Sequence, residues 1–515
     1  MRLQVSEEKI KGNSFTLPTN YNMVGFGSSV GTRIGRAISG EARMQVSWQW
    51  VIAIAFTFLL AKIIASVGLI AAAGVIGFFI LAPIVASILW NREVAIYLVL
   101  LLAFFISVPN RLVEGVPMGI ALDVLIVGSM IGLLYKCILD NDWRLFTTPM
   151  TVAILLWAGM NLFEVVNPGA ASRAAWFYVI RPAVEYMMLF FLTYSALDTP
   201  KKLNRFLFII LGLSIFSACW GIKQTTSGYF QWELNYVMSH DIVHLVFNYG
   251  RWRAIGSIGS PSQFGMIMAF VSMLSIALFT AYKGWVVRSF LLVSIITTLL
   301  AMVYSGTRTA YIIVPVFYFV WVILSRNKKL YFSILFAAGL LTIVATMPTN
   351  NYHIQRIQSM FKGSEDASYQ TRDRNRKLIM PWIAAHPIGG GLGSTGVWGQ
   401  RFSPGTFLAN FPPDSGLVRV SVELGWIGLL FFLNVYYNVL VKGSLLYWKM
   451  KNAKYKSIVA GMIAGISPLL IAEWGQEVVG VFPLSLLFWM FVAILFRAIY
   501  FDQQEQLQIN QNISK

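Results

Sequence analysis

Charged residues are scarce in this sequence. They make up 12% of the 515 residues, whereas hydrophobic residues make up 57%. A soluble globular chain carries about 25% charged residues. So few charges cannot cover a soluble surface of this size, and lipid must therefore be the solvent for most of the chain. The composition predicts an all-α polytopic membrane protein, because helices satisfy their own backbone hydrogen bonds in lipid.

Cysteine is scarce as well. Cys137 and Cys219 both fall in or beside apolar segments, so they provide neither a disulfide framework nor the spacing of a zinc site. The formal charge of +18 does not require a nucleic-acid partner, because lysine and arginine gather in the cytoplasmic loops of membrane proteins. No motif for DNA or RNA accompanies the charge. The first 46 residues are polar and do not resemble a cleavable signal peptide, and we expect a cytoplasmic tail there.

Apolar runs of roughly 20 residues, the length that a membrane-spanning helix needs, recur along the chain. The first two candidates form one long run that only Lys62 and Gly68 divide, and the third is short. We therefore expect about 12–14 spanning helices, with ten as the lower limit. The candidate runs are 48–65, 67–89, 94–108, 118–138, 149–166, 182–197, 203–222, 261–281, 286–304, 309–325, 330–347, 415–441, 456–473 and 480–500.

The basic residues favour one orientation of these helices. With the N-terminus inside, 24 of the 40 basic residues fall in inside segments; 14 fall in outside loops, and seven of those lie in one long loop. Because basic residues concentrate in cytoplasmic loops, we expect both termini in the cytoplasm. The expected divisions are a tail (1–46), spanning regions (47–222, 261–347 and 415–500), outside loops (223–260 and 348–414) and a second tail (501–515).

The two outside loops carry the residues suited to chemistry. Loops of this length are usually functional. They contain all four histidines, His240, His244, His353 and His386. His240 and His244 could share a helical face as zinc ligands do, but no third ligand accompanies them, and we predict no metal. We expect any chemistry to take place at the extracytoplasmic face.

Two arginine motifs flank predicted helices. The first is Arg251-Trp-Arg-Ala-Ile-Gly-Ser-Ile-Gly-Ser-Pro-Ser-Gln263, in which Arg251 and Arg253 beside glycine-rich backbone suit a diphosphate. An interfacial anchor for a helix end is the alternative. The second is Ser305-Gly-Thr-Arg308-Thr-Ala at a tight outside turn. An arginine so close to hydrocarbon is costly unless it is paired or faces water, and snorkelling to the interface is the alternative.

The second outside loop carries the third motif. Arg372 and Arg376 are four residues apart and share a helix face, and Trp382 continues the amphipathic pattern. The segment His386-Pro-Ile-Gly-Gly-Gly-Leu-Gly-Ser-Thr-Gly396 follows. Its glycines permit a close backbone approach to a ligand, and the segment is no Walker A loop because no Gly-Lys-Ser/Thr follows. The glycines proposed to contact substrate are Gly389, Gly390, Gly391 and Gly393.

The fourth motif is Phe411-Pro-Pro-Asp414-Ser-Gly, which enters a helix that continues to Gly425-Trp-Ile-Gly428. Asp414 lies where the chain enters the membrane, beside a helix N-terminus. A plain N-cap is the alternative to a catalytic role for this aspartate.

In their order and spacing, the four motifs resemble the O-antigen ligase/polymerase superfamily of bacterial envelope glycosyltransferases, over roughly residues 245–440. The resemblance implies a GT-C-like fold in the bacterial inner membrane. It also implies a donor glycan on undecaprenyl diphosphate, a glycan acceptor, and no cofactor. A chain-length regulator and a flippase are candidate partners.

The resemblance carries over to particular residues. Arg253 and Arg308 match the family arginines thought to hold the lipid diphosphate, and the glycine loop matches as well. Counting back from the two glycines of the fourth motif, the family's catalytic histidine falls on Asp414, with Ser415 in the following place. The chain therefore departs from the family here: either Asp414 is the base, or His386 swings in, or the chemistry differs or is lost.

A mechanism follows from this assignment. Arginines at the interface would stabilise charge on the leaving diphosphate. Asp414 could take the proton of the acceptor hydroxyl if burial made it a stronger base, and attack opposite the diphosphate would invert the anomeric centre. Because the ligase-type histidine is missing, a repeat-unit polymerase is favoured over a ligase. A transporter or scaffold is the third alternative, although no inverted repeat is evident, and the acidic residues Asp123, Glu164 and Glu185 lie near predicted helix ends.

Overall fold

The computed structural model describes residues 57, 87, 89–112, 118–248, 250–326, 328–361 and 367–513. The chain divides into two units, Met1–Val85 and Ala86–Lys515. The predicted tail 1–46, the run 48–65 and most of the run 67–89 therefore lie outside the described residues.

The second unit is built from helices, with one short ribbon in its described part. Strands β1 (Phe247–Asn248) and β2 (Arg251–Trp252) pair antiparallel, with Phe247 opposite Trp252. The helices in chain order are α4 (Arg92–Phe105), α5 (Ser107–Leu112), α6 (Met118–Asp140), η1 (Arg144–Thr147), α7 (Thr151–Phe163), η2 (Glu164–Val166), α8 (Arg173–Ala196), α9 (Pro200–Thr226), α10 (Gln231–Ser239), α11 (Val243–Val246), α12 (Pro261–Ala281), α13 (Trp285–Ser305), α14 (Arg308–Ser325), α15 (Lys328–Thr346), α16 (Tyr352–Gln358), α17 (Ala367–Ala385), α18 (Gly396–Phe402), α19 (Gly416–Glu423), α20 (Gly425–Tyr437), η4 (Asn438–Lys442), α21 (Gly443–Lys449), α22 (Ala453–Ala472) and α23 (Leu484–Ile513).

The prediction of an all-α polytopic membrane protein is confirmed. Within the described residues, ten helical stretches are long and apolar enough to cross a membrane. The predicted spans 149–166 and 330–347 correspond to shorter apolar helices in the regions of α7 and α15. The predicted spans 48–65 and 67–89 lie almost wholly outside the described residues.

Helix α8 begins earlier than predicted. The prediction started it at residue 182, but it starts at Arg173 and carries Pro182 in its interior. Proline is tolerated inside a membrane helix when neighbouring helices satisfy the freed backbone groups. The charge of Arg181 is accommodated by an ion pair with Asp123 of α6, in which Nη1 and Oδ2 are 2.7 Å apart.

The C-terminal helices also differ from the prediction. The single helix expected over 415–441 is divided at Leu424, because Gly425 adopts a φ of +69° and starts a new helix there. The predicted tail 501–515 is helical as far as Ile513, where α23 ends. The first change places Asp414 before a short separate helix, α19, rather than at the start of a membrane span.

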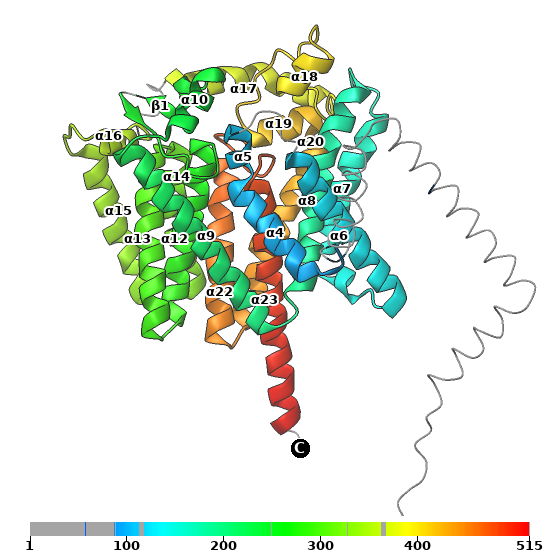
Figure 1. The fold of residues 1–515 in the computed structure, drawn as a ribbon, viewed down its shortest axis with the longest axis vertical. Coiled ribbons are helices and arrows are strands. Elements are labelled where there is room, and N and C mark those ends of the chain that lie inside the picture. Colours follow the sequence, from blue (N-terminus) through cyan, green and yellow to red (C-terminus); the bar gives the residue numbers. More distant parts are fainter. Residues whose placement is uncertain are drawn as a thin grey trace, which may run out of the picture. The chain divides into compact units, whose positions relative to one another are not determined.

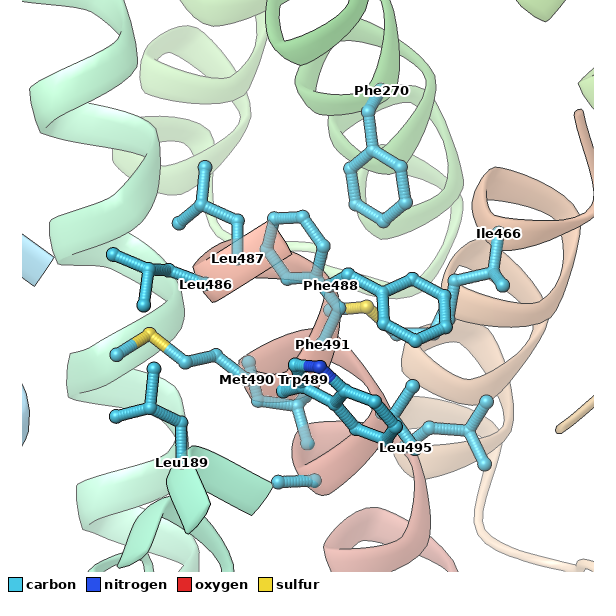
Figure 2. Close-up of a cluster of buried hydrophobic side chains, with 14 of the residues drawn as sticks. Leu189, Phe270, Ile466, Leu486, Leu487, Phe488, Trp489, Met490, Phe491 and Leu495 are labelled. Atoms are coloured by element: carbon cyan, nitrogen blue, oxygen red, sulfur yellow. The ribbon is translucent and has the colours of Figure 1, made fainter. Parts of the chain in front are cut away.

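Helix α23 forms the centre of the described unit. Phe488 and Phe491 have no exposed surface, and Trp489 is 3% exposed. Figure 2 shows these side chains packed against Phe270 of α12 and Ile466 of α22, and the rings of Phe270 and Phe491 stack with centroids 4.2 Å apart. Lipid is as apolar as these side chains, so close packing rather than the hydrophobic effect holds α23 in place.

The helices of the two long loops lie at one end of the bundle, called the loop face below. Figure 1 shows α10, α16, α17 and α18 at this end, whereas the C-terminal part of α23 extends from the opposite end. Arg111, predicted to be outside, lies at the loop face, where it donates to the carbonyl of Gly256 at 3.2 Å. Basic residues predicted to be inside line one cavity near the other end: Arg92, Lys136, Arg144 and Arg497.

Candidate functional site

All four sequence motifs meet at a turn that sequence reasoning did not single out. This junction turn, Glu473–Glu477, joins α22 to α23. Gln476 donates from Nε2 to the hydroxyl of Ser262 in the first motif, at 2.7 Å. Gly475 faces the second motif, since a Cβ at this glycine would lie 3.5 Å from Thr309 Cγ2. The first two motifs are therefore neighbours on one side of the turn.

The third and fourth motifs reach the same turn. The guanidinium of Arg376 lies 3.6 Å from the ring centroid of Trp474, and its Nε is buried without a hydrogen-bond partner among the described residues. Ser415 donates to the carbonyl of Glu473 at 2.8 Å. Segments more than 200 residues apart in the chain therefore meet at the five residues of the junction turn.

Three arginines gather at the start of α14, on the first side of the junction turn. Arg308 is the first residue of this helix and is partly buried. Arg253 donates from Nε to the carbonyl of Ser305 at 2.8 Å, and burial together with the charge of Arg356 lowers its pKa. Arg356 of α16, which the sequence analysis missed, donates to the carbonyl of Gly306 at 3.2 Å. Positive charge is therefore concentrated at a helix N-terminus, where anions bind favourably.

Arg253 uses three of its N–H donors in hydrogen bonds within the protein. Besides Ser305, it donates to the carbonyl of Leu245 at 2.9 Å and to the hydroxyl of Thr307 at 3.1 Å. A guanidinium has five N–H donors, so two remain for a ligand. Arg251, by contrast, is exposed on β2 and is a less enclosed candidate.

A narrow crevice brings Asp414 beside the basic face of α17. Arg372, Arg376, Asp414 and Ser415, all predicted site residues, line it together with Asn375, and its volume is about 10 Å³. Asn375 donates from Nδ2 to Asp414 Oδ2 at 3.0 Å. A crevice of this volume holds about one water molecule, so a sugar must bind over it rather than inside it.

Ser415, and not Asp414, caps the helix that follows these two residues. The N-cap of α19 is Ser415, whose hydroxyl accepts from the amide of Val418 at 3.4 Å. The alternative of a plain N-cap for Asp414 is therefore wrong. The condition that burial would make Asp414 a stronger base is not met, because this residue is exposed. Ser415 itself is 3% exposed and already bonded on both sides, which commits it to structure rather than to substrate.

The backbone of the glycine loop packs against the end of α19 and is not open to a ligand. The amides of Gly390 and Gly391 donate to the carbonyls of Val422 and Glu423 at 2.9 and 3.0 Å. The amide of Gly393 donates to Glu423 Oε2 at 3.1 Å. These groups are not available for a phosphate, so the predicted ligand contact of the loop is replaced by a packing role. The loop fixes the break between α19 and α20.

Two histidine alternatives are separated from this cluster. His386 stacks on Trp382, with centroids 4.0 Å apart, and follows the end of α17. Asn375 is eleven residues earlier on that helix, which puts His386 about 16 Å away along the axis from the contact with Asp414. His240 and His244 do not share a helical face, because α10 ends at Ser239 and α11 begins at Val243.

A comparison with known families matched part of the chain. The family model described as O-Antigen ligase matches residues 293–433. This match supports membership of the O-antigen ligase/polymerase superfamily. The matched region contains the second, third and fourth motifs, whereas the first motif and the junction turn lie outside it. No curated protein matches the chain.

A second group of charged side chains connects α19 to the junction turn. Arg419 lies between Glu423 and Glu477, with N···O separations of 3.3 and 2.5 Å, and the two carboxylates raise its pKa. These three residues and Glu473 line a cavity of about 110 Å³. Glu473 is 1% exposed and accepts two backbone amides, and burial raises its pKa to about 8. This network fastens α19, and hence Asp414, to the junction turn.

The residues that sequence reasoning missed gave only a weak signal. Trp474 and Gln476 lie in a short polar interruption, Glu-Trp-Gly-Gln-Glu, between two apolar runs. Two carboxylates beside a membrane helix are costly unless they are paired, and that cost was the available clue. Asn375 shares its turn of α17 with Arg372 and Arg376, but only the tertiary contact with Asp414 distinguishes it.

Proposed function

We propose that this protein is a polysaccharide repeat-unit polymerase of the bacterial inner membrane. It transfers a glycan from undecaprenyl diphosphate to a sugar hydroxyl at the loop face, which is the extracytoplasmic face in the predicted orientation. The observation that carries the proposal is the convergence of the four motifs on the junction turn. That convergence joins a cluster of arginines to an exposed carboxylate, the two elements that such a transfer requires.

The arginines are suited to the donor. Its leaving group is a lipid diphosphate, whose negative charge grows as the glycosidic bond breaks. Arg308 and Arg356 lie at the N-terminus of α14, where the diphosphate of a membrane-embedded lipid would bind. Arg372 of α17 lies beside the junction turn, because its Nη1 is 3.8 Å from the position that a Cβ of Gly475 would take. Charge-assisted hydrogen bonds from such groups stabilise the departing oxygen without a metal or a nucleotide.

Asp414 is suited to the acceptor. Its carboxylate is exposed above the crevice, and Asn375 holds one of its oxygens at 3.0 Å. The other oxygen can accept the proton of a sugar hydroxyl as that hydroxyl attacks the anomeric carbon. Attack from the side opposite the diphosphate inverts the anomeric centre. A chain-length regulator and a flippase would act with the enzyme in this pathway.

A ligase is the second candidate, because the matched family model is described as O-Antigen ligase. A ligase passes the glycan to the lipid A core, whereas a polymerase passes it to another lipid-linked unit. The absence of a histidine at position 414 favours the polymerase. The two activities leave different intermediates on the lipid carrier, which makes them separable in cells.

The decisive test uses a host in which this gene is deleted. Asp414→Asn keeps the shape of the side chain but removes the base, and we expect a rate reduced by about 10²-fold or more. A polymerase variant should accumulate lipid-linked single repeats on a glycan gel, whereas a ligase variant should accumulate long lipid-linked chains. His386→Ala and Asp373→Asn, matched in membrane level, are controls that should keep the full ladder.

The opposite results would reject particular parts of the proposal. A full ladder from Asp414→Asn would show that this carboxylate is not the base. If deletion of the gene changes no glycan, the protein is not the transferase, and a transporter or scaffold takes its place.

A further inference from the structure

A large cavity lies near the end of the described unit opposite the loop face. Its volume is about 730 Å³, and residues of α4, α6, η1, α8 and α23 line it. The proposed transferase site makes no use of it. The cavity is far larger than the crevice at Asp414, whose volume is about 10 Å³, so it can hold a substantial ligand.

The cavity carries positive charge that the protein does not neutralise. Arg92 and Lys136 form no hydrogen bond or ion pair through their side chains within the described part of the chain. Among the described residues of the lining, the carboxylates are those of Asp140 and Asp142. Asp142 is committed to Arg144, which donates to its two oxygens at 2.9 and 2.7 Å and holds its pKa at about 2.

Arg497 adds a third cation, held in place by the protein. Its Nε donates to the carbonyl of Leu197 at 2.8 Å, and its guanidinium lies 4.8 Å from the ring centroids of both Tyr194 and Tyr500. The bond to Leu197 uses one of the five N–H donors of the guanidinium. With Asp142 and Arg144 cancelling, Arg92, Lys136 and Arg497 face the single charge of Asp140, which leaves a net charge of about +2.

One wall of the cavity is apolar. Leu133 precedes Lys136 by one turn of α6, and Phe496 precedes Tyr500 by one turn of α23, so both lie nearer the middle of the bundle than the cations do. Leu446 of α21 extends this wall. The cavity is therefore polar at its outer end and apolar toward the hydrocarbon, which is the polarity of a lipid molecule.

We propose that this cavity binds the phosphate headgroup of an anionic membrane lipid. Arg92 and Lys136, whose side chains have no partner among the described residues, and the positioned Arg497 supply charge-assisted hydrogen bonds to phosphate oxygens. The two tyrosines and Thr148 of the lining add hydroxyl donors. Basic cavities between membrane helices on the cytoplasmic side bind such headgroups. Free inorganic phosphate shares this chemistry, but it would leave most of the volume and the apolar wall unused.

The test measures lipid-dependent stability of the full-length protein in detergent. Thermal unfolding is followed while phosphatidylglycerol, phosphatidylcholine or inorganic phosphate is titrated. We expect phosphatidylglycerol to raise the unfolding temperature, with phosphatidylcholine and phosphate much weaker. Lys136→Gln and Arg92→Gln should each weaken the apparent affinity for phosphatidylglycerol about fivefold, because a basic residue near a lipid surface contributes about 1 kcal/mol. Lys201→Gln, an exposed basic residue of α9 outside the cavity, should bind as wild type does.

Native mass spectrometry of the same variants gives a second readout that does not depend on their stability. Fewer retained phosphatidylglycerol molecules in Lys136→Gln than in Lys201→Gln would support the site. Equal stabilisation by phosphatidylglycerol and phosphatidylcholine, or no difference between the two variants, would overturn the proposal. An equally strong effect of inorganic phosphate would replace the lipid by a soluble phosphate ligand.

Discussion

Single positions decide the chemistry at the loop face. Asp414 and Ser415 are neighbours in the chain, yet the serine is buried as the cap of α19 and the aspartate is exposed beside Asn375. An extended residue before a helix directs its side chain away from that of the cap, since successive side chains of extended backbone alternate. One residue of register therefore separates a structural role from a proposed catalytic one.

Glu473 predicts a pH dependence of stability. Burial raises its pKa from an ordinary 4.5 to about 8, so the folded protein holds this proton more tightly than the unfolded chain. The corresponding stability is present below pH 4.5 and is lost as pH rises toward 8. Thermal unfolding in detergent between pH 5 and 9 should show a falling transition temperature for wild type and a flatter profile for Glu473→Gln.

An exposed carboxylate provides the control for this experiment. Asp241→Asn removes a negative charge at the exposed turn between α10 and α11, and its profile should follow that of wild type. A Glu473→Gln profile as steep as that of wild type would assign the pH dependence to other groups.

At the scale of elements, the glycine loop and the break between α19 and α20 depend on each other. Gly425 starts α20 in a left-handed conformation, and the amide of Ile427 donates to the carbonyl of Pro387 at 3.2 Å. Gly389 lies against the same break with a φ of +77°. Two chain segments approach so closely here that neither has room for a side chain.

Gly389→Ala should therefore destabilise the protein. The added Cβ would lie 2.5 Å from the carbonyl oxygen of Glu423 and from the amide nitrogen of Gly425, and the φ is unfavourable for alanine. We expect a loss of about 2 kcal/mol or more, measured as a lower unfolding temperature in detergent. Gly405→Ala is the matched control, because a Cβ there meets no atom within 4 Å. Equal unfolding temperatures would mean that the loop is free to move away.

At the scale of the whole molecule, the two ends of the described unit have different chemistry. The loop face gathers arginines around an exposed carboxylate, and the other end holds a basic cavity with an apolar wall. A transferase that uses a membrane lipid needs its reactive face on the side where the glycan lies. The orientation expected from basic residues places the loop face outside the cytoplasm.

Cysteine labelling in intact cells tests that orientation. In a Cys219→Ser background, Gln400→Cys lies on α18 at the loop face and Gln508→Cys lies near the end of α23, and both positions are exposed. A membrane-impermeant maleimide should label the first in spheroplasts and the second only after permeabilisation. The background protein without added cysteines is the control. The reversed pattern would put the loop face in the cytoplasm and reject the proposed donor.

The sequence by itself determined the solvent of this protein, the approximate positions of the apolar helices that the structure describes, and its resemblance to a family. Hydrophobic runs and scarce charge are local properties, so they can be predicted without tertiary contacts. The order of the four motifs was local information too, and it sufficed for the resemblance that the family match supports.

Only the tertiary structure decided which motif residues meet and which are occupied by the protein. The junction turn unites the motifs through contacts such as that of Gln476 with Ser262, which lie 214 residues apart in the chain. Other tertiary contacts occupy the amides of the glycine loop and bury Ser415, whereas Asp414 stays exposed. Burial and hydrogen-bond satisfaction depend on every neighbour in space, and the sequence of a motif does not contain its neighbours.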